Sequence, residues 1–263
     1  MMKLNLQRVI MFFVSLLLFA SCMGEGVNKD SRSAVGVVDL DAKTYSKKVL
    51  YLSEDFAIYS GRIVNTDFGA YLYVYYEIDY DAPENSYENV EANGYLTASY
   101  MEVIQELDQF RMEYAVTDTT KALTNEVAIL DPIVSGDLGY VRGKGFFFSF
   151  IEIPADQKLY WDLSCDMMNH VKEVYGQRYY DVYLRSYLHP EYPVSTKSLD
   201  HSYVLNAFDM RSYLERIALE EKSLGNSTFK LRFNYVSKID DEILTWGQQE
   251  SWEIAIDYIL TAE

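Results

Sequence analysis

The segment around residues 71–79 most strongly constrains the fold, because its side chains alternate in character with a period of two. One face of this segment carries Leu72, Val74, Tyr76 and Ile78, and the other carries Tyr71, Tyr73, Tyr75 and Glu77. Such alternation in β-branched and aromatic residues is typical of a β-strand. The chain is therefore expected to build at least one sheet.

Similar short apolar runs, separated by polar or turn-forming residues, predict further strands on both sides of this segment. They lie at 47–55, 56–64, 125–131, 145–151, 157–165, 178–188, 202–208, 228–237 and 251–260. The run at 145–151 is apolar on both faces, which favours a central strand of a sandwich.

Two segments show helical character instead. In 99–110 the residues Tyr100, Val103, Ile104 and Leu107 form one helical stripe, and Ser99 and Glu102 have the spacing of a capping box. The segment 210–222 has helical composition, with Asp209 as a plausible cap.

The order of these elements predicts a mainly β chain of two domains. Strands, one helix and further strands are the order of a small OB-type barrel, which we place at 44–123. Strands at short spacing with one brief helix favour a β-sandwich at 124–263. Hydrophobic content of 49% and aromatic content of 15% argue against a largely disordered chain.

The first 22 residues resemble a bacterial lipoprotein signal. Lys3 and Arg8 precede an apolar run over 9–19, which is shorter than the roughly 20 residues of a membrane span. The small residues Ala20 and Ser21 then precede Cys22, as in a lipobox. We predict a signal peptide at 1–21, lipidation of Cys22 and a flexible tether over 22–43. The alternative is an ordinary signal peptide with a cysteine placed there by chance.

The charge of the chain limits its partners. The full chain carries a net charge of −17, and removal of residues 1–21 with their two cations makes it −19. Because nucleic-acid binding needs the opposite sign, no nucleic-acid partner is expected. Anionic lipid should also repel the chain, so the predicted membrane partner is held by the lipid at Cys22.

No motif for catalysis, a metal or a cofactor is recognisable. The three histidines show no metal-binding spacing, and the acidic segment 79–91 lacks the order of a calcium loop. Cys165 is expected to be a small buried residue rather than a reactive thiol. A pair of carboxylates for glycoside hydrolysis cannot be selected among 40 acidic residues.

The high number of tyrosines, 24, is the unusual feature of the composition. Tyr71, Tyr73 and Tyr75 lie on the more polar face of their predicted strand and form a candidate ligand face for a glycan or peptide. The competing interpretation is that they are partly buried wall residues of the sheet.

The order of several segments resembles the NigD-like lipoproteins of Bacteroides-group bacteria. These segments are LFASC at 18–22, LYVYYEIDYD at 72–81, SYMEVIQEL at 99–107, DPIVSGDLGYVRGKGFFFSF at 131–150, SYVLNAFDMRSYLE at 202–215 and STFKLRFNYV at 227–236. The resemblance implies an OB-like first domain, a β-rich second domain and an outer-membrane lipid anchor, facing either the periplasm or the surface. It supplies no catalytic or ligand-binding residue.

Three functions remain open on this sequence. The first is a non-enzymatic, lipid-anchored binding or structural module of the cell envelope. The second is an accessory protein that binds glycans or peptides through exposed tyrosines. The third is an envelope hydrolase with an unrecognised carboxylate pair.

Overall fold

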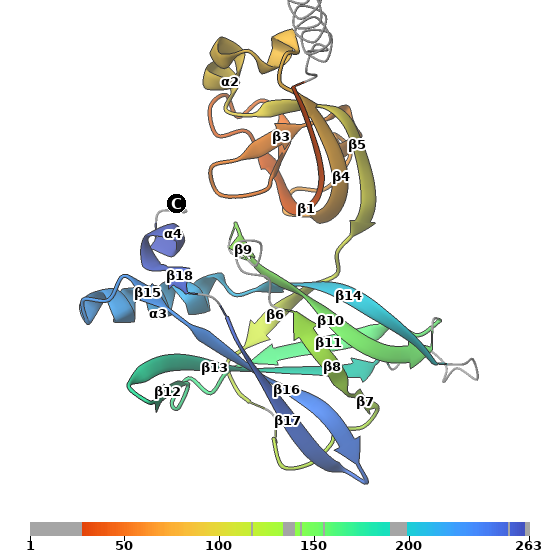
Figure 1. Ribbon diagram of the computed structural model, residues 1–263, viewed down its shortest axis with the longest axis vertical. Coiled ribbons are helices and arrows are strands. Elements are labelled where there is room, and N and C mark those ends of the chain that lie inside the picture. The colour runs from red at the N-terminus through yellow and green to blue at the C-terminus, as the bar shows by residue number, and fades with distance from the viewer. Residues whose placement is uncertain are drawn as a thin grey trace, which may run out of the picture.

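The computed structural model describes residues 28–116, 118–133, 140–142, 144–154, 156–189, 199–251 and 253–260. Its fold is mainly β, with a closed five-stranded barrel followed by a domain built on a second, large sheet (Figure 1), which confirms the predicted fold class. The predicted signal peptide and Cys22 lie outside the described residues.

The first domain is a closed barrel with the strand order β1-β2-β3-β5-β4. Its strands are β1 (Lys29–Leu40), β2 (Lys48–Tyr51), β3 (Ala57–Tyr59), β4 (Tyr71–Asp79) and β5 (Leu96–Glu106). Short 3-10 helices η1 (Gly61–Ile63) and η2 (Pro83–Asn85) and the helix α2 (Tyr87–Asn93) complete it. The alternation in β4 directs Leu72, Val74, Tyr76 and Ile78 into the barrel core.

The barrel begins earlier than the sequence predicted. Residues 29–40 form β1, which pairs with β4 from Lys29↔Asp79 to Val37↔Tyr71, so the prediction of a flexible tether up to residue 43 is wrong for this part. The first half of β1 has the polar composition expected of a tether because only the second half of the strand is buried. At Gly36 an added Cβ would lie 2.6 Å from the carbonyl oxygen of Tyr51, so this crossing of β1 and β2 needs glycine.

The predicted helix at 99–110 is instead the strand β5 and the start of the next strand. The pairing of β5 with β4 shifts register twice, leaving Ser99 and Ile104 as extra residues on β5. Each bulge interrupts the period of two, and the interrupted alternation resembles a helical stripe. The helix of this domain, α2, lies in the segment predicted as an acidic loop, with the Ser86 side chain accepting from the Asn89 amide and Gly94 ending it at a φ of 77°.

The second domain is built on an 11-stranded sheet with the main order β17-β16-β13-β11-β6-β14-β10-β8. These strands are β6 (Gln109–Glu113), β7 (Glu126–Val127), β8 (Ile129–Ile133), β9 (Tyr140–Val141), β10 (Lys144–Pro154), β11 (Leu159–Ser164), β12 (Val171–Val174), β13 (Gln177–Leu188), β14 (Leu199–Asp209), β16 (Leu231–Asp240) and β17 (Ile243–Glu250). A small separate sheet pairs β15 (Thr228–Phe229) with β18 (Ile254–Ala255).

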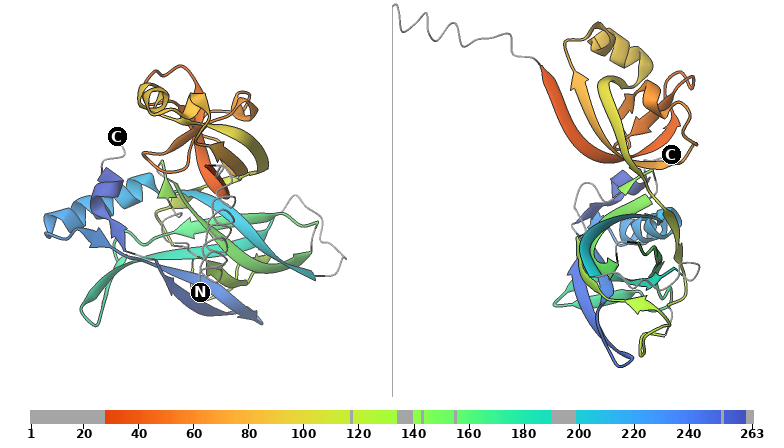
Figure 2. Two further views of the ribbon diagram at one scale, coloured as in Figure 1. Left: turned by 45° about the horizontal axis from the view of Figure 1, so that its top comes forward. Right: turned by 90° about the vertical axis from the view of Figure 1, so that its right-hand side faces the viewer.

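Strand β6 joins the two halves of this sheet, because it pairs in parallel with both β14 and β11. The halves fold over so that β8 contacts β16 and one main core lies between them (Figure 2). Since β6 starts at Gln109, the predicted boundary between 123 and 124 assigned this strand to the wrong domain. The predicted central strand at 145–151 is part of β10, between β14 and β8.

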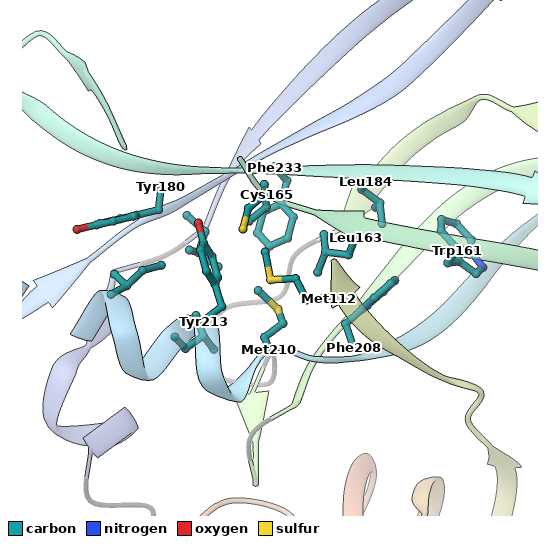
Figure 3. Packing of buried hydrophobic residues seen from close by; sticks show 14 of the residues in the cluster. Met112, Trp161, Leu163, Cys165, Tyr180, Leu184, Phe208, Met210, Tyr213 and Phe233 are labelled. Carbon is teal, nitrogen blue, oxygen red and sulfur yellow. The ribbon is translucent and has the colours of Figure 1, made fainter. Parts of the chain in front are cut away.

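The helix α3 (Arg211–Ser223) packs on this core, as predicted for 210–222. It buries Tyr213, Leu214, Ile217, Ala218 and Glu221, which recur at helical spacing. Met210 holds the cap position, and the Asp209 carboxylate accepts from the Arg211 amide at 3.4 Å. Figure 3 shows Tyr213 and Met210 against Cys165, Met112 and Phe233 of the core.

A second short helix, α4 (Ile256–Leu260), adds to the single helix expected in this domain. Within the described ranges, none of the helices has the length and apolar character needed to span a bilayer.

Candidate functional site

The predicted tyrosine face is divided by the structure. Tyr71 is only 1% exposed, and its hydroxyl donates to the carbonyl oxygen of Val141 in the second domain at 3.1 Å. It belongs to a cluster that joins the two domains, which we call the junction cluster. The members used below are Val35, Val37, Tyr51, Tyr71, Val141, Leu205 and Ala207. Tyr71 therefore cannot take part in an exposed ligand face.

Polar contacts reinforce this junction. The Arg142 amide donates to the Glu54 carboxylate at 2.6 Å, and its guanidinium lies 3.8 Å from the centre of the Tyr51 ring. Arg211 of α3 donates to the Arg142 carbonyl oxygen at 2.9 Å. The turn after β9 is thus held by the barrel on one side and by the second domain on the other.

Tyr73 and Tyr75 are partly exposed, but they do not form one strip. Tyr73 packs against the junction cluster, whereas the Tyr75 ring meets that of Tyr100 at 6.1 Å in an edge-on arrangement. The Tyr75 hydroxyl donates to Glu77. On neighbouring β5, Tyr100, Val103 and Ile104 are exposed. The aromatic surface of the barrel is therefore centred on Tyr75 and Tyr100.

A cavity of about 150 Å³ opens where β6 lies between β11 and β14, and Gln105 at the end of β5 of the barrel also lines it. We call it the β11–β14 cavity. Its apolar wall is formed by Phe110, Ile153, Leu159, Trp161, Val204 and Leu205. Its polar lining consists of Gln105, Asp108, Gln157, Lys158 and Asn206. An apolar wall with a few polar groups is typical of small-ligand sites.

Asn206 is the unusual member of this lining. The residue is 3% exposed, and its buried Nδ2 has no hydrogen-bond partner among the described residues. A buried donor without a partner costs free energy, and such groups are rare in folded proteins.

The mouth of the cavity carries one ion pair. Lys158 Nζ lies 3.3 Å from the Asp108 carboxylate, and both side chains are about half exposed, at 48% and 60%. Close to the cavity, the ring of Phe110 meets Tyr160 edge-on at 5.7 Å, and Tyr160 stacks on Tyr187. Opposite charges at the mouth cancel, so the site has no net charge among its described lining residues.

Sequence reasoning did not find this site. The one available signal was the polar Asn206 within the apolar strand SYVLNAF, which is unexpected for a strand buried on both faces. The other lining residues come from five separated elements, and only the fold brings them together.

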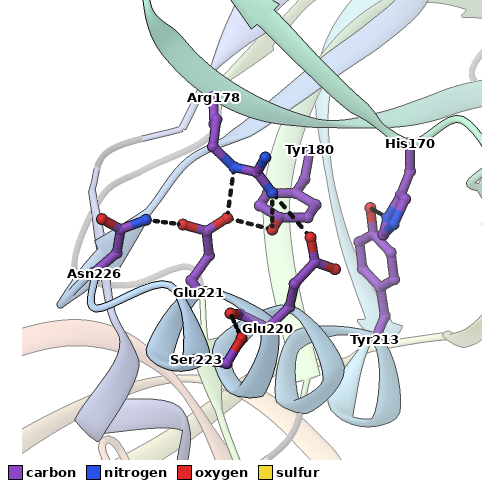
Figure 4. A network of polar contacts seen from close by, with 8 residues as sticks. All are labelled: His170, Arg178, Tyr180, Tyr213, Glu220, Glu221, Ser223 and Asn226. Carbon is purple, nitrogen blue, oxygen red and sulfur yellow. Dashed lines mark hydrogen bonds and ion pairs between the residues drawn. The ribbon is translucent and has the colours of Figure 1, made fainter.

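A partly buried polar cluster lies beside α3, and its members bind one another (Figure 4). Arg178 contacts the carboxylates of Glu220 and Glu221, each at 2.9 Å, and Glu221 also accepts from Tyr180 and Asn226. Burial opposes ionisation of Glu221, but these hydrogen bonds outweigh it and lower its pKa. The group has its own partners and shows no place for a ligand.

His170 and Cys165 also behave as core residues. His170 lies 3.3 Å from the Tyr213 hydroxyl, and burial lowers its pKa. Burial raises the pKa of the Cys165 thiol to about 12, which disfavours the reactive thiolate. The prediction that Cys165 is a small buried residue is confirmed.

The acidic segment 79–91 shows no calcium geometry. Asn85 uses its side chain to bond the backbone of Asp79 and Thr97, which ties η2 to β5. Among the residues that the structure describes, no group of three or more His, Cys, Asp or Glu is placed to hold a metal ion.

The comparisons with known proteins concern the barrel and the fold. Residues 26–104 match the family model described as a lipoprotein OB domain, which covers the barrel strands. No curated protein matches the chain. A crystal structure of an uncharacterised protein from Parabacteroides merdae is 20% identical, with a TM-score of 0.70 over 86% of this chain and 99% of that one.

A second solved structure is similar over the same share of this chain. It is a candidate lipoprotein from Bacteroides fragilis, 12% identical, with a TM-score of 0.54 over 86% of this chain and 99% of that chain. At these identities the similarity shows the fold alone. The barrel of this chain therefore matches the lipoprotein OB domain model, and its two-domain fold is similar to those of the Parabacteroides and Bacteroides proteins.

Proposed function

We propose that this protein is a lipid-anchored, non-enzymatic binding module of the cell envelope, of the NigD-like type, that holds its ligand in the β11–β14 cavity. The observation that carries the proposal is the cavity itself, which brings apolar side chains of four strands together with five polar side chains. The lipoprotein OB match at 26–104 supports the envelope address, and the lipobox at Cys22 supports an anchor in the outer membrane.

The lining of the cavity favours binding over hydrolysis. Glycoside hydrolysis by the usual route needs two carboxyl groups that face each other across the bond. Among the described lining residues Asp108 is the single carboxylate, and it is paired with Lys158. A ligand would therefore be held without a second acid to attack it.

A second candidate surface is the aromatic pair Tyr75 and Tyr100 on the barrel. The two rings are in contact, and Tyr100 is 46% exposed. Exposed aromatic rings can stack on sugars or peptide side chains, which keeps the glycan- or peptide-binding accessory function open at this surface.

The ligand part of the proposal is tested by native mass spectrometry of the mature protein purified from envelopes. We expect the wild-type protein to carry a bound small molecule that Val204→Phe lacks, because the larger ring fills the cavity. Tyr203→Phe is the matched control on the same strand, since Tyr203 is exposed and keeps its ring. An unliganded wild-type protein, or a ligand retained by Val204→Phe, would contradict binding in this cavity.

The lipid anchor in the cell envelope is tested with Cys22→Ala. A single acyl chain binds membranes only marginally, whereas several anchor stably, so loss of the lipidated cysteine should release the protein from membranes. Metabolic labelling with a palmitate analogue and membrane fractionation provide the measurement. Persistent label in Cys22→Ala would refute the anchor.

A further inference from the structure

We infer that one end of the barrel rests on zwitterionic lipid headgroups, with Tyr80 and Tyr87 as the contacting side chains. This end consists of the start of β1 and of residues 79–93, and we call it the α2 end. The inference rests on the lipid anchor of the proposed function, because it names the surface that the anchored protein turns toward the membrane. It is carried by the length of chain before β1, by the exposed tyrosines and by the charge of this end.

The chain between the predicted anchor and the barrel is short. The described structure begins at Asn28, whose carbonyl oxygen accepts from the Tyr80 amide at 2.9 Å, and β1 pairs with β4 from Lys29 onward. Asn28 is six residues after Cys22. Six residues of fully extended chain span at most about 22 Å. With the lipid on Cys22, the start of β1 therefore lies within that distance of the headgroups.

The α2 end carries two exposed tyrosines. Figure 1 shows α2 and the start of β1 together at this end, with the second domain at the other end of the barrel. Tyr80 directly follows β4 and is 36% exposed, and Tyr87, the first residue of α2, is 76% exposed. Between them, the Asn85 side chain donates to the carbonyl oxygens of Asp79 and Thr97, which fixes η2 and α2 on the barrel. An aromatic ring with one polar atom suits the boundary between lipid and water, where tyrosine is enriched.

The barrel separates the second domain from this end. From Lys29 at the α2 end to Val37 in the junction cluster, β1 extends over eight residues, which is at most roughly 26 Å at about 3.3 Å per residue. The hydrogen bond from Tyr71 to Val141 then holds the second domain at this junction. A chain attached before β1 therefore carries its second domain on the opposite side of the barrel from the attachment.

The charge of the α2 end selects the kind of lipid surface. Lys29 and Arg32 form ion pairs with acidic side chains, and Lys43 lies beside Gly94 just after α2. Four further exposed acidic residues lie at this end: Asp81, Glu84, Glu88 and Glu91. The described residues of the α2 end are thus negative on balance. Anionic headgroups repel such a surface, whereas zwitterionic headgroups carry no net charge to do so.

The test uses the acylated mature protein in vesicles of phosphatidylcholine, part of which carries a nitroxide on its headgroup. The lipid occupies the Cys22 thiol and Cys165 is buried, so one introduced cysteine takes a fluorescent label. Ala92→Cys places the label on α2, and Glu173→Cys on β12 is the matched control, since both positions are exposed. The label on α2 should be quenched at least about threefold more strongly, because the short connection holds only this end near the headgroups.

Tyr87→Ser should reduce the quenching of the label on α2 by about twofold or more, because this end then lacks an interfacial ring. Tyr175→Ser is the matched control, since Tyr175 is fully exposed on the turn after β12 and should leave the quenching unchanged. Both variants should melt as the parent does, because each replaces an exposed side chain.

The lipid composition tests the role of charge. Phosphatidylglycerol mixed into the vesicles should lower the quenching at about 0.01 M salt, where the screening length is about 30 Å, and not at about 1 M salt, where it is about 3 Å. Quenching that rises with phosphatidylglycerol would overturn the choice of zwitterionic lipid.

The remaining outcomes separate this inference from the proposed function. Equal quenching of the two labels in acylated, vesicle-bound protein would overturn the orientation and leave the lipid anchor in place. Quenching on α2 that Tyr87→Ser does not change would overturn the contact by this tyrosine. A protein that carries no acyl chain and stays off the vesicles would instead overturn the anchor, which metabolic labelling of Cys22→Ala tests separately.

Discussion

The hydroxyl of Tyr71 lies 3.1 Å from the carbonyl oxygen of Val141 and donates a hydrogen bond to it across the junction of the two domains. Leu205 and Ala207 of β14 lie in the same cluster, and β14 also supplies Val204, Leu205 and Asn206 to the cavity. One strand thus contacts the barrel and lines the candidate site. The barrel therefore helps to position the strand on which the site is built.

Tyr71→Phe should lower stability by about 1 kcal/mol, because it removes one buried hydrogen bond and keeps the ring. Tyr71→Ser should cost roughly 3 kcal/mol or more, because it also removes a buried ring. Tyr75→Ser is the matched control on the same strand and should cost less, since Tyr75 is partly exposed. Thermal melts of the three variants beside the parent measure this order. Equal losses for Tyr71→Ser and Tyr75→Ser would contradict the buried junction.

Asp41→Asn should destabilise the barrel at neutral pH. Burial opposes ionisation of Asp41, but hydrogen bonds from the Lys47 and Thr44 amides, the Thr44 hydroxyl and the Ser46 amide hold its pKa well below the ordinary value of 3.8. Because the folded pKa is depressed, the ionised carboxylate stabilises the fold above about pH 4, and this stabilisation is lost as pH falls further.

The measurement for Asp41 is the melting temperature of parent and Asp41→Asn between pH 7 and pH 2. The difference between the two should be largest at neutral pH and should shrink below about pH 4. Asp67→Asn, at an exposed position of the same domain, should show little difference at any pH. A difference that grows on acidification would contradict the assigned sign.

Glu126→Gln should destabilise the second domain strongly. The Glu126 carboxylate accepts from Arg185 Nε at 2.6 Å and Nη2 at 2.7 Å, and both side chains are almost fully buried. Removal of one partner of a buried pair typically costs about 3–5 kcal/mol, because the other charge is left without compensation. Arg185 also donates to the carbonyl oxygens of Asp118 and Lys121. Loss of its ion pair with Glu126 should therefore also loosen the segment 118–121.

The control for this ion pair is Asp240→Asn, which removes the exposed pair with Lys238. Exposed pairs contribute about 0–1 kcal/mol, so this variant should melt close to the parent. Denaturant unfolding of both variants is the measurement. If Asp240→Asn and Glu126→Gln lowered the free energy of unfolding by similar amounts, burial would not explain the contribution of the pair between Arg185 and Glu126.

A fragment that starts at Asp108 should fold on its own, whereas one that starts at Asn125 should not. The longer fragment keeps β6, which pairs with both β14 and β11 and so joins the two halves of the sheet. The shorter fragment also lacks the carbonyl groups of Asp118 and Lys121 that bind Arg185. Near-UV circular dichroism during a thermal melt is the measurement, and a cooperative melt of the shorter fragment would contradict the role of β6.

Local patterns in the sequence determined the secondary structure where one face of an element meets one core. The alternation in 71–79 predicted β4, and the helical composition of 210–222 predicted α3, because each element has one face that is buried along its length and another that is more exposed along most of it. Together with the aromatic and apolar content, these patterns also determined the mainly β class. The net negative charge of the chain follows from its composition alone.

The tertiary structure decided the features that depend on which elements meet. The register shifts at Ser99 and Ile104 follow from the pairing of β5 with β4 in the closed barrel. They interrupt the period of two, which is why residues 99–110 were predicted to form a helix. Tyr71 lies on the more polar face of β4, yet Val141 of the second domain covers it. Asn206 and the rest of the cavity lining come from segments up to about a hundred residues apart. A local pattern records which face of an element is buried, but contacts between distant elements arise only from the packing of the whole chain.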